Sequence, residues 1–133
     1  MKKINKLSQG STRYVYDLEN GTVLKIAMDS KGVQCNKSEV LTYSKAAEKL
    51  KKHLASIILY EKDYRWLVMK KYNITPPQSE AFSIELKKVV KLFRENGLTP
   101  RDILRRSGPV YNNLRLNDKN DIIIIDYGKF ILR

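Results

Sequence analysis

Two oxygen-bearing side chains near the C-terminus, Asn113 and Asp126, have residue types that could hold a metal ion. Asp126 follows a run of four isoleucines and is itself followed by Tyr127 and Gly128. Carboxylate and carboxamide oxygens are ligands that magnesium prefers. The pair therefore predicts a magnesium site at the two ends of one hairpin. The alternative is an edge hairpin that ends in a polar residue and binds nothing.

A second pair of candidate residues, Lys25 and Glu39, carries opposite charges. Lys25 lies between apolar residues in the segment VLKIA, where a buried ammonium without a partner would be costly. It must point out of the core or face an anionic partner, and Glu39 near the start of the following helix is the natural one. Upstream, residues 7–16 (LSQGSTRYVY) contain a glycine and several hydroxyl groups, and backbone N–H groups in such a turn could lie over phosphates.

The first half of the chain is expected to supply strands and one helix that position these residues. Alternating β-type residues predict strands over 12–18 and 22–27, and the intervening Asn20-Gly21 is a strong hairpin signal. Residues 29–38 are expected to form a polar loop, and residues 38–54 an amphipathic helix.

The second half is separated from the first by a proline-containing breaker. Residues 55–72 predict two strands around a charged turn, and Pro76-Pro77 interrupts both strand and helix. Residues 79–97 predict a second helix that is capped by Ser79, and residues 111–128 predict a hairpin. This order indicates two lobes with a hinge between them.

The order and spacing of these segments resemble the protein-kinase-like fold, the family of protein kinases and related small-molecule kinases. The segment LSQGSTRYVY resembles the glycine-rich loop, and LVMKKY resembles the strand that leads into the hinge. The interval of 13 residues between Asn113 and Asp126 matches the family's interval from the metal-binding Asn to the Asp of the DFG motif. The resemblance implies that ATP and magnesium are cofactors, with Asn113 and Asp126 as the metal ligands. The nucleotide-binding residues that it implies are Ser8, Gly10, Ser11, Val15, Lys25, Glu39 and Met69.

The fold class implied by the resemblance is α+β. A small antiparallel sheet plus one helix would form an N-lobe over residues 1–72, and a hinge would span residues 73–78. Residues 79–133 would form a reduced C-lobe of one helix and a β-hairpin. The whole chain, residues 1–133, would be a single truncated kinase-like domain.

Three departures from the family pattern bear on activity. Only Gly10 remains of the loop glycines, and Arg13 stands where another would be, able either to block the phosphates or to bind them. The position of the catalytic base holds Gly108, although Asp102 could serve if the loop carries a six-residue insertion. The alternative for Asp102 is to cap a short helical turn. An activation segment and a substrate platform are not found after Asp126.

The charge of the chain favours polyanionic partners. Its 133 residues carry a net charge of +12, which suits nucleotides, nucleic acid or an acidic protein. We expect a protein partner or a nucleic-acid-bearing partner on the basic surface, and self-association could cover the open lower lobe. The alternative is that each basic cluster is a solvated helix face that binds no partner. No apolar run approaches the roughly 20 residues that span a bilayer, so no membrane partner is expected. The single cysteine indicates a reducing, cytoplasmic location.

Three functions follow from these patterns. The first is a pseudokinase-like accessory or regulatory protein with an ATP-type cleft, because the catalytic loop is degraded. The second is an active minimal serine/threonine-type phosphotransferase that uses Asp102 as its base. The third is a basic nucleic-acid-binding protein, suggested by the charge and by aromatic residues that ordinary strand packing would also explain. These aromatic residues are Tyr14, Tyr16, Tyr60, Tyr64 and Trp66.

Overall fold

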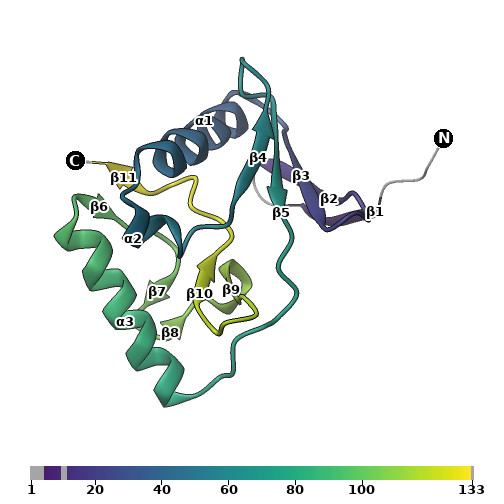
Figure 1. Ribbon diagram of the computed structural model, residues 1–133. Coiled ribbons are helices and arrows are strands. Elements are labelled where there is room, and N and C mark those ends of the chain that lie inside the picture. The colour runs from purple at the N-terminus through teal and green to yellow at the C-terminus, as the bar shows by residue number, and fades with distance from the viewer. Residues whose placement is uncertain (1–4, 10–11, 133) are drawn as a thin grey trace.

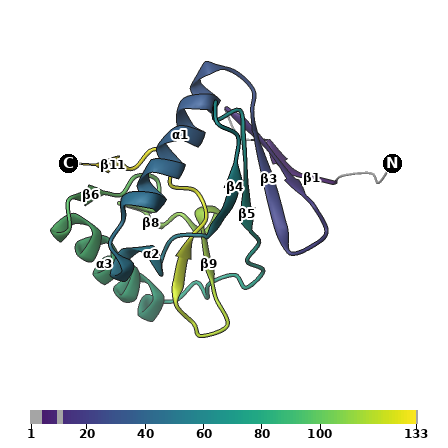
Figure 2. The same cartoon turned by 45° about the horizontal axis from the view of Figure 1, so that its top comes forward.

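The chain is α+β in the computed structural model, which describes residues 5–9 and 12–132. Within these residues it has one five-stranded sheet, three two-stranded sheets and three α-helices (Figure 1). The five-stranded sheet and its helix lie at one end of the molecule, and a long helix with several short hairpins lies at the other (Figures 1 and 2).

The five-stranded sheet is antiparallel throughout, with the strand order β1-β2-β3-β5-β4. Its strands are β1 (Asn5–Gln9), β2 (Arg13–Asp17), β3 (Thr22–Ala27), β4 (Ile57–Tyr60) and β5 (Trp66–Lys70). The hairpin expected around Asn20-Gly21 is confirmed as β2 and β3. The sequence did not identify β1 as a strand, because its residues were interpreted as a turn that leads into β2.

The register of the sheet places one set of alternating side chains toward the protein interior. Lys25 on β3 lies between Val15 on β2 and Leu67 on β5. Lys25, Leu67 and Met69 are buried, whereas β4 is an edge strand whose Leu59 is 48% exposed. The sheet therefore presents Lys25 toward the helix that packs against this face.

That helix, α1 (Ser30–Lys45), begins eight residues earlier than the sequence predicted. The expected polar loop over residues 29–38 is wrong, because Asp29 caps the helix and accepts a hydrogen bond from Gly32 N. At Gly32 in this helix, an added Cβ would lie 2.3 Å from the carbonyl oxygen of Thr12. Close packing of α1 on the sheet, rather than chain flexibility, explains this glycine.

The predicted continuation of this helix to residue 54 is also wrong. The chain leaves the helix at Ala46, which has an extended backbone with ψ of 139°, and a short helix α2 (Glu48–Lys51) follows. The break turns the chain so that Leu50 and Leu54 become buried. Tertiary packing here outweighs the high helix propensity of alanine.

Beyond the breaker, α3 (Glu80–Glu95) is confirmed together with its cap, since Ser79 Oγ accepts from Phe82 N at 3.1 Å. Phe82, Leu86, Val89, Val90 and Phe93 are buried, whereas Ile84 is 48% exposed. Ala81 is exposed and Leu92 is half-buried.

The remaining elements are short antiparallel hairpins. The predicted hairpin over residues 111–128 is confirmed as β9 and β10, although its strands are shorter than expected. The elements are β6 (Leu98–Thr99), β7 (Leu104–Arg105), β8 (Gly108–Pro109), the 3₁₀ turn η1 (Tyr111–Asn113), β9 (Leu114–Leu116), β10 (Ile122–Ile124) and β11 (Ile131–Leu132).

Backbone hydrogen bonds tie the segment after α2 to β10. His53 O accepts from Ile124 N at 2.8 Å, and Ala55 N donates to Ile124 O at 2.9 Å. His53 Nδ1 also lies 2.8 Å from Ile122 O. These bonds fix the end of β10, and therefore the residues that follow it, against the sheet-and-helix half of the protein. Among the described residues, no helix combines the length and the apolar character needed to cross a bilayer.

Candidate functional site

Four charged side chains meet where β2, β3, α1 and the segment after β10 come together. We call Arg13, Lys25, Glu39 and Asp126 the charge cluster. Glu39 on α1 is fully buried and is its centre. Its Oε1 accepts from Lys25 Nζ at 3.0 Å and from Arg13 Nη1 at 2.7 Å. Its Oε2 accepts from Arg13 Nη2 at 3.3 Å and from the backbone N–H of Tyr127 at 2.8 Å.

The Glu39 carboxylate is held in its ionised form by its two cationic neighbours. Burial alone would raise the pKa of Glu39, but Arg13 and Lys25 outweigh that effect and lower the pKa to about 2. Two buried cations thus share one buried anion, and the hydrogen bond from Tyr127 N adds to the stabilisation of the charged form.

Lys25 connects the sheet to the segment that carries Asp126. Its ammonium donates to Glu39 and also to the backbone carbonyl of Ile125 at 2.7 Å. Burial lowers the pKa of Lys25, and the positive charge of Arg13 acts in the same direction against the attraction of Glu39. The expected pairing of Lys25 with Glu39 is therefore present, and it places the ammonium one residue from Asp126.

Arg13 is the side chain that joins Asp126 to the cluster. Its Nη2 donates to Asp126 Oδ1 at 3.1 Å, and its Nη1 donates to Asn36 Oδ1 at 3.0 Å. Burial would lower the pKa of Arg13, but Glu39 and Asp126 raise it above its ordinary value, so the guanidinium stays charged. Asn36 in turn donates to the backbone carbonyl of Tyr64 at 2.9 Å, which fixes its amide. Arg13 is a fixed part of the site rather than a mobile surface arginine.

The Asp126-Tyr127-Gly128 turn is held from two sides. Tyr127 is fully buried, and its hydroxyl donates to Ala55 O at 2.7 Å, while burial raises the pKa of the phenol well above its ordinary value. A Cβ at Gly128 would lie 3.0 Å from the carbonyl oxygen of Cys35 on α1, so a glycine suits this close approach. The turn leaves the Asp126 side chain 48% exposed, at the open side of the charge cluster.

Asn113 and Asp102, eleven residues apart in sequence, are adjacent in space. Asn113 Nδ2 donates to Asp102 O at 2.8 Å. The residues between them form the β7–β8 hairpin, which closes on itself through a bond from Val110 N to Ile103 O at 2.9 Å. No helix follows Asp102, so the helix-cap interpretation of this residue is wrong. Asn113 O also accepts from Ile125 N at 3.0 Å, which places Asn113 beside the segment that leads to Asp126.

The Asp102 carboxylate is exposed and faces cations. Its Oδ1 lies 3.4 Å from Arg105 Nη2, its Oδ2 lies 3.7 Å from Lys129 Nζ, and its side chain is 41% exposed. The backbone at Asp102 is left-handed, with φ of 60°, a conformation that aspartate tolerates better than most residues. The carboxylate is thus accessible to a hydroxyl group.

The other predicted nucleotide-binding residues differ in how close they lie to the charge cluster. Met69 is 1% exposed and pairs with Val23 in the sheet, and Val15 is half-buried beside Lys25. Ser8 lies in β1 and pairs with Val15. Gly10 and Ser11 lie outside the described residues.

Sequence reasoning missed Asn36 and left the role of Arg13 open. Asn36 lies in the segment that was interpreted as a loop, although it precedes Glu39 by three residues and so lies on the same face of a helix. Recognition of Asp29 as a helix cap would have revealed that relationship. The Arg13 position was identified, but its partners come from two distant segments, α1 and the residues after β10, and carry no local signal.

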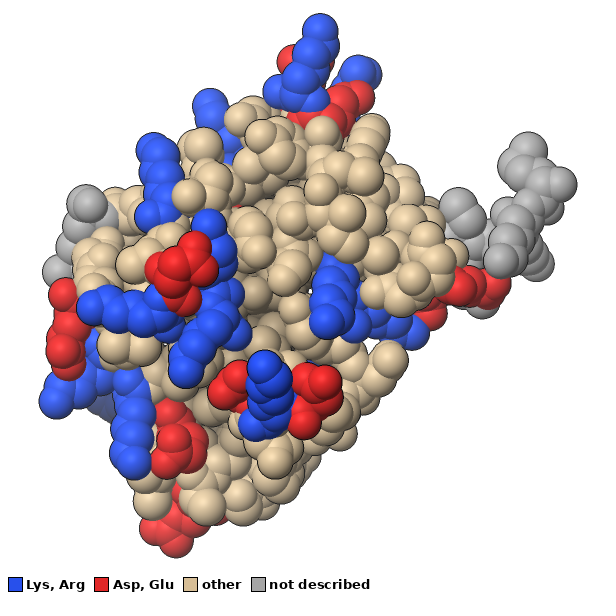
Figure 3. Space-filling view, in the orientation of Figure 1, with Lys and Arg blue, Asp and Glu red and all other residues tan. Residues whose placement is uncertain are grey.

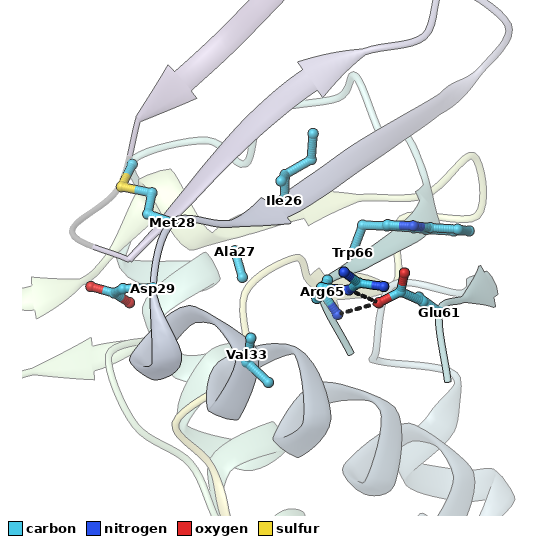
Figure 4. Close-up of a pocket in the computed structure, with 8 residues that line it drawn as sticks. All are labelled: Ile26, Ala27, Met28, Asp29, Val33, Glu61, Arg65 and Trp66. Carbon is cyan, nitrogen blue, oxygen red and sulfur yellow. Dashed lines mark hydrogen bonds and ion pairs between the residues drawn. The ribbon is translucent and has the colours of Figure 1, made fainter. Parts of the chain in front are cut away.

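Two surface cavities lie away from the charge cluster. One, of about 480 Å³, lies between β3, the start of α1 and the turn after β4, where Glu61 and Arg65 form a 2.6 Å ion pair (Figure 4). The other, of about 470 Å³, lies on α3 between Lys87, Arg94 and Leu104. Neither is lined by a residue of the charge cluster, so contacts rather than cavity size identify the candidate site.

Charge is distributed unevenly on the face seen in Figure 3. Basic side chains gather over α2 and α3 with acidic ones among them, whereas the surface over β4 and β5 is largely uncharged (Figure 3). Tyr60 and Tyr64 stack on each other, with ring centroids 5.9 Å apart and planes 7° apart. Tyr60 nevertheless stays 47% exposed, and an anionic partner for the basic surface stays a prediction.

The described residues contain no group of three or more His, Cys, Asp or Glu side chains that could hold a metal ion. No protein-family model matches the chain, and no curated protein matches it significantly. The geometry of the charge cluster is therefore the guide to the function of this protein.

Proposed function

We propose that this protein is a kinase-like nucleotide-binding protein that serves an accessory or regulatory role. The observation that carries the proposal is the ion pair between Lys25 on β3 and Glu39 on α1, at 3.0 Å. In protein kinases a strand lysine pairs with a helix glutamate, and this pair positions the phosphates of ATP. The same carboxylate accepts from Tyr127 N, which joins the pair to the Asp126-Tyr127-Gly128 turn.

The arrangement of elements supports the same proposal. A five-stranded antiparallel sheet with one packed helix is followed by a proline-containing connector and a unit of one helix and short hairpins. This is the order expected of an N-lobe, a hinge and a reduced C-lobe over residues 1–72, 73–78 and 79–133. Lys25, Glu39 and Asp126 come from both units and meet where the units join.

Binding is favoured over turnover because an arginine of the chain already pairs with the expected magnesium ligand Asp126. Asp126 Oδ1 accepts from the Arg13 guanidinium at 3.1 Å. Asn113 would offer only its Oδ1, since its Nδ2 donates to Asp102 O. Nucleotide binding needs a fixed cation for the phosphates. Lys25 Nζ has a third hydrogen beyond its bonds to Glu39 and to Ile125 O, and Arg13 offsets the charge of Asp126.

Calorimetric titration with ATP tests the proposal. Wild-type protein is expected to bind ATP, and Lys25→Ala is expected to weaken binding by about tenfold or more, because one charge-assisted contact to phosphate is lost. Lys88→Ala is the matched control, since Lys88 pairs only with the exposed Glu85 on α3. Thermal unfolding of each variant identifies any loss that is due to misfolding. Absence of ATP binding by folded wild-type protein would refute the proposal.

Phosphoryl transfer is a second candidate function, favoured by the contact between Asn113 and Asp102. Because the β7–β8 hairpin closes on itself, the six-residue insertion does not separate Asp102 from Asn113. The exposed Asp102 carboxylate could then orient an acceptor hydroxyl. Incubation with γ-labelled ATP should give labelled protein or free phosphate, and Asp102→Asn should abolish the signal. Activity that survives this change would exclude Asp102 as the base.

A further inference from the structure

Arg13 occupies the place at Asp126 that a metal ion would need. Its guanidinium donates to Asp126 Oδ1 at 3.1 Å and to both oxygens of Glu39, at 2.7 and 3.3 Å. A fourth bond, to Asn36 Oδ1 at 3.0 Å, fixes the remaining Nη1 hydrogen. Arg13 itself is 7% exposed, so the guanidinium is enclosed by its partners.

The charges of the cluster balance without a metal. Arg13 and Lys25 are positive, Glu39 and Asp126 are negative, and the four lie in one chain of contacts. Without Arg13 the remaining three side chains would carry one net negative charge, which would oppose the phosphates of a nucleotide. A bound cation would correct that excess, and here a guanidinium from the chain itself does so.

The position of Arg13 also takes Asp126 Oδ1 away from a cation. Removal of the guanidinium from Asp126 would break contacts with Glu39 and Asn36 at the same time, because the same group holds all three. It would leave Glu39 with fewer partners in a fully buried position, which is costly. A divalent cation would have to compete with this whole set of bonds rather than with water.

We propose that the Arg13 guanidinium takes the place of a divalent cation at Asp126, so that the site binds nucleotide through its own fixed cations and without magnesium. This inference rests on the proposed nucleotide binding and adds the form of the ligand. The preferred ligand is the free nucleotide, because magnesium on the phosphates reduces the negative charge that Lys25 attracts, whereas Arg13 already offsets the charge of Asp126.

The decisive experiment compares ATP titrations of wild-type protein in EDTA and in excess magnesium. We expect the affinity in EDTA to equal or exceed the affinity in magnesium. Binding that is more than about threefold tighter with magnesium would overturn the inference and leave nucleotide binding intact. Absence of binding in both conditions would overturn both proposals, so the two failures are distinguishable.

A variant then tests whether Arg13 is the cause. Arg13→Gln removes the charge and keeps a hydrogen-bonding side chain, and it should weaken binding in EDTA by about tenfold. Magnesium should strengthen ATP binding by Arg13→Gln, but it should not strengthen ATP binding by wild-type protein. The matched control is Arg65→Gln, because Arg65 forms an exposed ion pair with Glu61 outside the cluster. Equal binding by Arg13→Gln and wild type in EDTA would overturn the role of Arg13. If Arg13→Gln does not fold, the wild-type comparison alone decides the question.

Discussion

Replacement of Glu39 by glutamine should destabilise the protein strongly, because Glu39 is the anion that two buried cations share. At neutral pH the change leaves Arg13 and Lys25 with Asp126 as their only carboxylate among the residues of the cluster. Loss of one partner from a buried ion pair costs about 3–5 kcal/mol. Glu39→Gln keeps the size of the side chain, so little of the loss would come from a cavity.

The pKa of Glu39 gives an independent magnitude. The pKa is about 2 in the folded protein, against an ordinary value of 4.5. Since each pKa unit corresponds to about 1.36 kcal/mol, ionised Glu39 stabilises the folded state by about 3 kcal/mol at neutral pH. The folded pKa is the lower one, so this stabilisation is present above pH 4.5 and is lost as the pH falls toward 2. At pH 3 the same relation leaves roughly half of this stabilisation.

Urea unfolding monitored by the fluorescence of Trp66, the only tryptophan, measures both effects. Urea is preferable to guanidinium chloride, because a salt would screen the charges. The free energy of unfolding of Glu39→Gln should lie about 3 kcal/mol below that of wild type at pH 7, and the difference should shrink by about half at pH 3. Glu85→Gln, which alters an exposed pair on α3, should unfold like wild type. A difference below about 1 kcal/mol at pH 7 would refute the central role of Glu39.

Three further changes test other contacts. Gly32→Ala should lower the melting temperature, because the new Cβ would lie 2.3 Å from Thr12 O, and this clash outweighs the helix preference of alanine. A rise in melting temperature would contradict the close packing of α1. Tyr127→Phe should cost about 1–2 kcal/mol in urea unfolding, because Ala55 O loses a buried partner; an unchanged midpoint would show that the hydroxyl bond is dispensable. His53 is the only histidine, and burial lowers its pKa from 6.5. The free energy of unfolding should therefore fall as the pH decreases below 6.5, and His53→Gln should remove that dependence between pH 7.5 and 5.5.

Local signals in the sequence were sufficient for several elements. Asn20-Gly21 marks the β2–β3 hairpin, and Ser79 marks the start of α3. Both depend on residues that are close in the chain, so no knowledge of the tertiary structure is needed. The pairing of Lys25 with Glu39 was also predictable, because a buried ammonium requires an anion and the following helix offers one.

The remaining features depend on contacts between distant segments. The helix break at Ala46 opposes the preference of alanine, and it is explained only by burial of Leu50 and Leu54 elsewhere in the core. The bond between Arg13 and Asp126 joins residues that are 113 positions apart. The separation of Asp102 from Asn113 in sequence likewise concealed their adjacency in space. The residues between them form a hairpin whose two ends lie side by side, so the hairpin lengthens the chain but does not move Asp102 away from Asn113.

The exposed edge strand β4 has a consequence for how the protein behaves when it is concentrated. Ile58, Leu59 and Tyr60 are each about half exposed on a strand that has a neighbour on one side only. Such an edge can pair with another molecule, and a net charge of +12 opposes that encounter at low ionic strength. The range of this repulsion falls from about 10 Å at 0.1 M salt to about 3 Å at 1 M salt. We therefore expect mutual repulsion between molecules to limit the pairing of β4, and added salt to weaken that protection.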